Sequence, residues 1–129
     1  MKANHKLALA VLAGVTIGVA GATAIHAQQE KVAPGYFIAE VNVTDLATMQ
    51  KYGEKVPDTL APFNHHYVVR GGNPQVLEGE PPMPHVVIIA FDSVAKAHEW
   101  YDSPAYQAIK PIRQSAAKAR IFIAEGVAP

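Results

Sequence analysis

The residues best suited to bind a small molecule begin with Arg70, which ends an apolar run and precedes Gly71-Gly72. A guanidinium offers a planar fork of donors that matches a carboxylate or a phosphate. A glycine turn can present backbone N–H groups to the same anion. The alternative is a tight hairpin turn in which Arg70 pairs with Glu78. The pattern therefore indicates either an anion site or a structural ion pair.

A second group of such residues contains Trp100-Tyr101, Tyr106 and Arg113, on both sides of a predicted helix break at Ser103-Pro104. Aromatic rings, a phenol and a guanidinium can line a small-molecule pocket between helices and a sheet. The alternative for Trp100 is a place in the hydrophobic core. Tyr106 and Arg113 are therefore the ligand-binding candidates of this group.

The histidines do not form a convincing metal site. His65 and His66 are neighbours on a predicted strand, so their side chains point to opposite faces. A metal needs three or four converging ligands, whereas His85 is expected at the far end of a hairpin and His98 on a helix. We expect no metal site and a strand entry with one histidine facing a cleft. His66 joins Arg70, Tyr106 and Arg113 as a ligand-binding candidate, and no catalytic residue is assigned.

The composition excludes several classes of chemistry. The chain of 129 residues has no cysteine, so thiol catalysis, disulfides and cysteine-based metal clusters are ruled out. No P-loop, GxSxG or GxGxxG motif is present. No cofactor is assigned, and only cofactor-independent or heme-linked chemistry stays open. The net charge is zero, which gives no support to nucleic-acid binding.

The first segment has the features of an export signal. Lys2 and Lys6 precede a run of 19 uncharged residues, 7–25, and small residues near Ala24 and Ala27 offer cleavage sites. The sequence predicts a signal peptide over 1–27 and a periplasmic or secreted protein. The alternative is an uncleaved N-terminal helix that anchors the chain, because the run is long enough to span a bilayer. Its many Ala, Gly and Thr residues favour cleavage.

The remainder is expected to hold a short linker and one domain. Residues 28–35 form the linker, and apolar, β-branched runs then predict four strands. These runs are 36–43, 65–70, 86–91 and 121–124, and a short hairpin extension is expected at Val76-Leu77. Pro-rich residues 80–84 exclude a helix or a central strand.

Two helical regions separate these strands. The first starts at an Asp45 cap and should present one apolar face. The expected residues of this face are Leu46, Met49, Gly53, Val56 and Leu60. The second starts after Asp92-Ser93, with a packing face of Val94, Ala97, Trp100 and Tyr101, and restarts with Ser103 as cap and Pro104 at the first position. The expected stripe after the restart is Ala105, Ile109, Ile112 and Ala116.

The element order β-α-β-β-α-β is that of the ferredoxin-like fold, an α+β plan. Residues 36–126 should form a four-stranded antiparallel sheet with both helical regions on one face. The other face would be bare in a monomer, although we expect it to carry the largely apolar side chains of Tyr36, Ile38, Tyr67 and Phe122. We expect a second copy of the chain to cover this face, which makes a homodimer.

Several motifs, in order and at matching gaps, resemble the family of domain of unknown function 1330. They are Tyr67-Val68-Val69-Arg70-Gly71-Gly72, Val76-Leu77-Glu78-Gly79, Val86-Val87-Ile88-Ile89-Ala90-Phe91, Trp100-Tyr101-Asp102-Ser103-Pro104-Ala105-Tyr106-Gln107, Arg113, Ala116-Ala117 and Glu125-Gly126. The resemblance covers about Tyr36 to Gly126 and implies a dimeric α+β barrel. Asn64-His65-His66, His85 and Ala90 depart from the family pattern, so the charge of any polar site shared by the family would differ here.

Three functions stay open at this point. The first is an exported homodimer that binds a small organic ligand, aromatic or carboxylated, between sheet and helices. The second is a cofactor-independent monooxygenase or isomerase, in which His66 or Tyr106 would move a proton. The third is a structural or interaction module without a small-molecule site. A fold resemblance alone does not choose among them.

Overall fold

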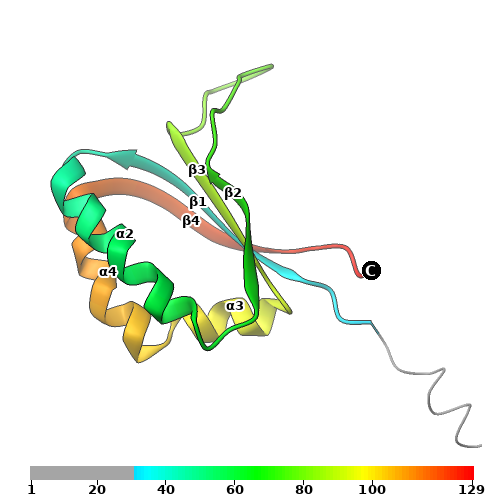
Figure 1. Cartoon of the computed structure of the whole chain (residues 1–129). Helices are drawn as coiled ribbons and strands as arrows, with labels where there is room; N and C mark the ends of the chain where they lie inside the picture. Colours follow the sequence, from blue (N-terminus) through cyan, green and yellow to red (C-terminus); the bar gives the residue numbers. More distant parts are fainter. Residues whose placement is uncertain (1–30) are drawn as a thin grey trace, which may run out of the picture. The chain divides into compact units, whose positions relative to one another are not determined.

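The computed structural model describes residues 31–129, so the predicted signal segment 1–27 lies outside the described residues. The elements of this part are β1 (Gly35–Val43), α2 (Leu46–Leu60), β2 (His65–Gly71), β3 (His85–Phe91), α3 (Val94–Tyr101), α4 (Pro104–Ala116) and β4 (Ala117–Glu125). Helices α2, α3 and α4 all lie on one side of the sheet (Figure 1). Within residues 31–129, every helix is too short or too polar to cross a membrane.

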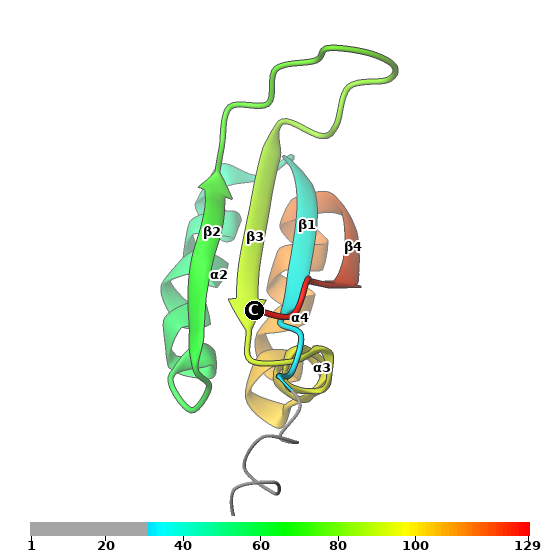
Figure 2. The same cartoon turned by 90° about the vertical axis from the view of Figure 1, so that its right-hand side faces the viewer.

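The sheet has the ferredoxin-like order β2-β3-β1-β4, and every neighbouring pair is antiparallel. Viewed from its open side, the sheet shows β2 and β4 at the edges with the helices behind (Figure 2). The predicted α+β fold, a four-stranded antiparallel sheet with helices on one face, is therefore confirmed. Residues 72–84 contain no strand, so the hairpin extension expected at Val76-Leu77 is absent.

The predicted caps start all three helices. The side chain of Asp45 accepts a hydrogen bond from Thr48 N at 3.1 Å, and that of Ser93 accepts one from Lys96 N at 3.1 Å. Ser103 Oγ accepts from the backbone N of the third helical residue at 3.2 Å. Each cap satisfies a backbone N–H that has no partner inside its helix. These local signals fix where the helices begin.

The buried faces of α2 and α4 differ from the predicted stripes. Leu46 is 67% exposed, and Ala105 is exposed as well. Val56 and Leu60 on α2 and Ile109 and Ala116 on α4 are buried as predicted. The buried residues outside the predicted stripes are Tyr52 and Thr59 on α2 and Tyr106 and Arg113 on α4. Polar residues replace the expected apolar ones because each has a hydrogen-bond partner inside. An apolar stripe alone could not reveal such partners.

The core is centred on Trp100, which is 1% exposed. Its ring stacks on Phe91 at a centroid distance of 5.4 Å, meets Phe37 edge-on at 5.0 Å and contacts Tyr106 at 4.4 Å. Its indole N–H donates to Thr59 Oγ1 at 3.0 Å. This cluster ties α3 and α4 to β1 and β3, which places the core between helices and sheet, as expected for Trp100.

Tyr67 lies on the helix side of the sheet, not on the open side that was expected for it. It pairs with Ile89, which is a core residue, and it packs against the core itself. The open side instead carries Tyr36, Ile38, Ile88 and Phe122, whose mutual register places them together. Both sides of the sheet are thus apolar, but only one is covered by helices of residues 31–129.

Candidate functional site

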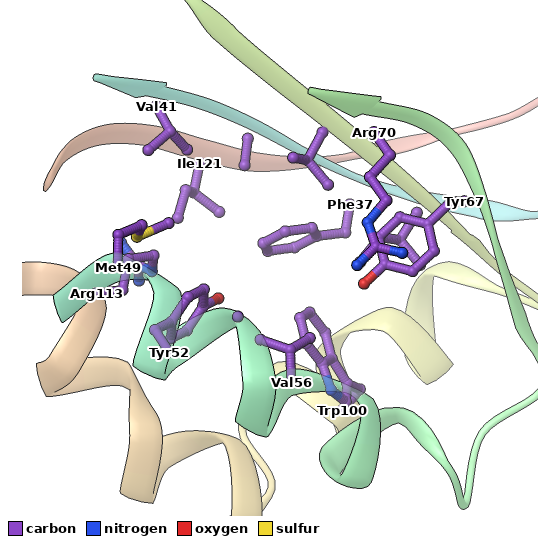
Figure 3. A pocket seen from close by; sticks show the side chains of 14 residues that line it. Phe37, Val41, Met49, Tyr52, Val56, Tyr67, Arg70, Trp100, Arg113 and Ile121 are labelled. Atoms are coloured by element: carbon purple, nitrogen blue, oxygen red, sulfur yellow. The ribbon is translucent and has the colours of Figure 1, made fainter. Parts of the chain in front are cut away.

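A cavity of about 230 Å³ lies between the sheet and helices α2 and α4 (Figure 3). Most of its wall is apolar. The lining residues are Phe37, Ala39, Val41, Met49, Tyr52, Gly53, Val56, Tyr67, Arg70, Val87, Ile89, Trp100, Arg113 and Ile121. Four of these carry a polar tip that can face a ligand, namely Tyr52, Tyr67, Arg70 and Arg113. An apolar chamber with a few placed polar groups is the usual form of a small-molecule site.

Arg113 belongs to the last turn of α4 and is only 6% exposed. Its Nε donates to the Tyr106 hydroxyl at 3.3 Å, and that hydroxyl lies 2.9 Å from the Tyr52 hydroxyl on α2. The buried Tyr106 proton needs an acceptor, and within residues 31–129 the Tyr52 oxygen is the one in reach. Either hydroxyl can be the donor in this bond. When Tyr106 donates, the hydroxyl proton of Tyr52, which lines the cavity, can point toward a ligand.

The same environment fixes the protonation of these groups. Burial, assisted by the neighbouring Tyr106 hydroxyl, raises the pKa of Tyr52 far above the value of a free phenol. Desolvation pulls the pKa of Arg113 down, but the phenolic oxygens of Tyr106 and Tyr52 outweigh it, so the net shift is upward. At neutral pH the cavity therefore holds a neutral phenol as donor and a permanent positive charge.

No carboxylate of residues 31–129 neutralises the charge of Arg113. The ion pairs in this part of the chain are Lys96–Glu99 and Arg120–Glu40, and neither involves Arg113. Taking a charge out of water without a counter-ion is unfavourable, and for Arg113 only neutral phenol groups offset this desolvation. The positive charge of Arg113 thus lacks a counter-ion among residues 31–129, and the site is suited to an anion.

Arg70 also lines the cavity, through a β-bulge in β2. The register between β2 and β3 shifts between Tyr67 and Val69, which leaves Val68 as the extra residue. Arg70 then pairs with Val87 on the cavity side, and its guanidinium lies 4.7 Å from the centre of the Tyr67 ring. The alternative ion pair with Glu78 does not form within the described residues.

The four candidates named from sequence do not lie together. Arg70 and Arg113 line the cavity, and Tyr106 lies behind its wall with 0% exposure. His66 pairs with Ala90 on the open side of the sheet and borders a separate, shallow hollow. No cluster of three potential metal ligands occurs among residues 31–129.

Tyr52 and Tyr67 are cavity residues that the sequence analysis did not propose. Tyr52 lies three residues after Met49 and four before Val56, so its helical spacing did contain the signal. Tyr67 was assigned to the wrong face of the sheet. A search for polar tips on the sheet-facing side of the helices would have found Tyr52, whereas Tyr67 required the correct face of β2 to be known.

Solved structures with the same fold differ widely in sequence. A protein of unknown function from Rhodopseudomonas palustris is 20% identical, with a TM-score of 0.62, over 83% of this chain and 92% of that one. SnoaB, a cofactor-independent oxygenase from Streptomyces nogalater, is 8% identical, with a TM-score of 0.54, over 76% and 97%. A dimeric ferredoxin-like protein of unknown function from Thermobifida fusca is 14% identical, with a TM-score of 0.50, over 76% and 95%.

None of the curated proteins matches the chain. The family model described as "Domain of unknown function (DUF1330)" matches residues 34–127, which are most of the chain. This agrees with the motifs noted from Tyr67 to Gly126. The chain therefore belongs to the DUF1330 family and shares its fold with SnoaB and with a dimeric ferredoxin-like protein of unknown function.

Proposed function

We propose that this domain binds a small organic anion with a flat, apolar body in the cavity between sheet and helices. One observation carries the proposal: the buried guanidinium of Arg113 lines an apolar cavity and has no acidic partner among residues 31–129. A bound carboxylate would supply the missing counter-charge. Binding would then offset part of the folding free energy that is lost because Arg113 is buried without a counter-ion.

The donors around the cavity fit a carboxylate. Arg113 uses Nε for Tyr106, so its terminal nitrogens stay available as a fork for two oxygens. Either hydroxyl can donate in the Tyr52–Tyr106 hydrogen bond. In the bound state proposed here Tyr106 donates to the Tyr52 oxygen, and Tyr52 offers its own proton to the ligand. The hydrogen-bond chain from Arg113 through Tyr106 to Tyr52 thus orients two donors toward one ligand group.

The size and walls of the cavity favour a ligand of about one substituted ring. An apolar cavity of about 150 Å³ is large enough to bind benzene, and this one measures about 230 Å³. Phe37 and Trp100 supply aromatic surface on two sides of it (Figure 3). Aromatic carboxylates of the benzoate class therefore match both its volume and its charge.

The alternative of an enzyme that moves a proton is less well supported. The lining residues include no histidine and no carboxylate. The raised pKa of Tyr52 makes it a poor base at neutral pH, and His66 lies on the other side of the sheet. SnoaB is an oxygenase, but its 8% identity supports only the shared fold.

Calorimetric titration of the full chain with benzoate and with benzamide tests the proposal. The two probes have the same shape and differ in charge. We expect benzoate to bind at least tenfold more tightly, because a hydrogen bond to a charged group contributes about 1.5–3 kcal/mol. Arg113→Gln should remove this difference, whereas Lys55→Gln, which removes a charge from the exposed face of α2, should preserve it.

Two results would overturn the proposal. One is equal affinity for benzoate and benzamide in the unmodified protein. The other is an unchanged benzoate affinity in a folded Arg113→Gln variant, which would show that the guanidinium does not contact the anion. Circular dichroism and a cooperative melt establish that each variant is folded before its titration is compared.

We also propose that a second copy of the chain covers the open side of the sheet. In support, Phe122 is 50% exposed on this side, and the register across the four strands runs from Phe122 through Ile38 and Ile88 to Val69. Such a contiguous apolar surface usually marks an interface. The Thermobifida fusca protein of the same fold is described as dimeric.

Light scattering at micromolar concentration tests this assembly. We expect a dimer mass for the unmodified protein and a monomer mass for Phe122→Glu, since a charge would be buried without a partner. Leu46→Glu introduces the same charge at an exposed leucine of α2 and should stay dimeric. A monomer mass for the unmodified protein would refute the proposal.

Export is a third proposal and rests on the sequence of residues 1–27 alone. The basic start and the uncharged run support a signal peptide that is cleaved near Ala24 or Ala27. Intact mass measurement of protein from the envelope fraction should give a chain that starts after one of these residues. An intact Met1 or Lys2 start would contradict cleavage and favour the anchored alternative.

A further inference from the structure

The second arginine of the cavity, Arg70, is there because of the β-bulge at Val68. Without the extra residue, alternation along β2 would place Arg70 on the open side together with His66. The bulge reverses the alternation and sends the side chain of Arg70 to the helix side. Bulges commonly redirect a side chain next to a binding or active site. The local backbone of β2 is thus built in a way that adds a charge to this cavity.

The charge of Arg70 is held in place without being neutralised. Its guanidinium lies over the ring of Tyr67, another lining residue, and no carboxylate of residues 31–129 forms an ion pair with it. A cation–π contact orients the group but keeps its full positive charge and most of its donors free. Arg70 is also exposed, so it stands where the cavity meets the solvent.

The two arginines approach the cavity from opposite ends. Arg113 lies beside Met49 at one end, and Arg70 lies beside Tyr67 at the other, with Phe37 and Tyr52 between them (Figure 3). The topology agrees with this view. Arg70 belongs to the edge strand β2, whereas Arg113 precedes β4, the opposite edge strand.

We propose that the ligand is a dianion, an apolar and flat spacer with an acidic group at each end, of which the aromatic dicarboxylates are the simplest class. This inference rests on the proposed anion-binding function and extends it to a second anchor. Arg113 with Tyr52 binds the buried acidic group. Arg70, oriented by Tyr67, binds the outer group at the mouth of the cavity. The aromatic and aliphatic walls contact the spacer.

Calorimetric titration with terephthalate and its monomethyl ester tests the second anchor, because the two compounds share a spacer and differ by one charge. Succinate, adipate and suberate, each compared with its monomethyl ester, extend the test to other spacings. We expect at least one diacid to bind about tenfold or more tightly than its monoester. Arg70→Gln should reduce that preference to within about twofold and leave the affinity for the monoester nearly unchanged. Arg70→Lys should give an intermediate preference.

The outcomes separate the two proposals. If every monoester binds as tightly as its diacid, or if Arg70→Gln keeps the preference, the second anchor is refuted while benzoate binding through Arg113 still stands. If no diacid, monoester or benzoate binds, the anion-binding function itself fails. Lys55→Gln serves as the control for loss of one positive charge elsewhere, and it should behave as the unmodified protein does.

Discussion

Each side of the sheet carries an arginine, and the two arginines differ in whether a carboxylate pairs with them. On the open side, Arg120 donates to Glu40 at 2.8 Å, and Glu40 also accepts from Met83 N at 3.1 Å. On the helix side, Arg113 has the phenol of Tyr106 and no carboxylate of residues 31–129. Arg120 therefore has a counter-ion, whereas Arg113 has none within residues 31–129. A protein retains such a lone buried charge at a cost to its stability, which is the pattern expected where function requires it.

The aromatic residues of the two sides differ in the same sense. Trp100 is surrounded by the rings of Phe37, Phe91 and Tyr106, while Phe122 is half exposed on the open side. On the helix side, the apolar side chains are therefore covered by other residues of 31–129, except at the cavity. The open side has no such cover among residues 31–129, and the proposed second copy of the chain would supply it. The predictions below test this contrast, beginning with the largest effect.

Removal of the central core ring should cost most. We expect Trp100→Ala to lower the free energy of unfolding by about 3–5 kcal/mol, the usual cost of emptying a large aromatic site. Phe122→Ala is the matched change on the open side and should instead lower the dimer affinity, with little effect on a monomer. Urea unfolding at several protein concentrations separates the two effects. Equal losses that do not depend on concentration would contradict the contrast.

The lone charge gives the second prediction. In ligand-free protein, we expect Arg113→Met to raise the free energy of unfolding by roughly 1–3 kcal/mol, because an apolar side chain of similar length replaces a desolvated charge. Arg120→Met, on the open side, should bring no such gain. Thermal and urea unfolding measure both variants. A clear loss of stability in Arg113→Met would show that Tyr106 and Tyr52 already satisfy the guanidinium.

Local signals made the fold predictable. The caps at Asp45, Ser93 and Ser103 act within three residues of the chain, so their hydrogen bonds can be read from the sequence. The strands were recognisable from their β-branched residues, and the order of elements then restricted the topology. The packing of the Trp100 side of α3 followed from helical spacing for the same reason.

The site was harder to predict from the sequence because it depends on non-local features. One bulge residue, Val68, reverses the alternation of β2, and nothing in the run His65–Gly71 marks where the extra residue lies. For this reason Arg70 and His66 end on opposite sides, although both were candidates for one site. The burial of Arg113 and Tyr106 depends on Tyr52, which is 54 residues from Tyr106 in the chain. Such a partner is visible only after folding.

The phenol pair gives a third, smaller effect. Tyr52→Phe removes the hydrogen-bond partner of the buried Tyr106 hydroxyl, and we expect it to lower the free energy of unfolding by about 1 kcal/mol. It should also weaken benzoate binding by about tenfold if the Tyr52 hydroxyl donates to the anion. Tyr36→Phe is the matched change on the open side, where this hydroxyl makes no hydrogen bond within residues 31–129. Calorimetric titration and unfolding of both variants provide the comparison.

The smallest effect concerns pH and belongs to the completed charge of the open side. The hydrogen bond from Arg120, followed by that from Met83 N, lowers the pKa of Glu40 below its ordinary value of 4.5. A carboxyl with a lowered pKa in the folded state adds stability above its unfolded pKa, and this stability is lost as the pH falls through the folded pKa. We therefore expect the melting temperature to drop slightly below about pH 4.5, and Glu40→Gln to reduce that part of the drop. Arg113 has no acidic partner within residues 31–129, so Arg113→Gln should leave this low-pH drop of the melting temperature unchanged. If Arg113→Gln, rather than Glu40→Gln, reduced the drop of the melting temperature at low pH, the assignment of paired and unpaired charges to the two sides of the sheet would be reversed.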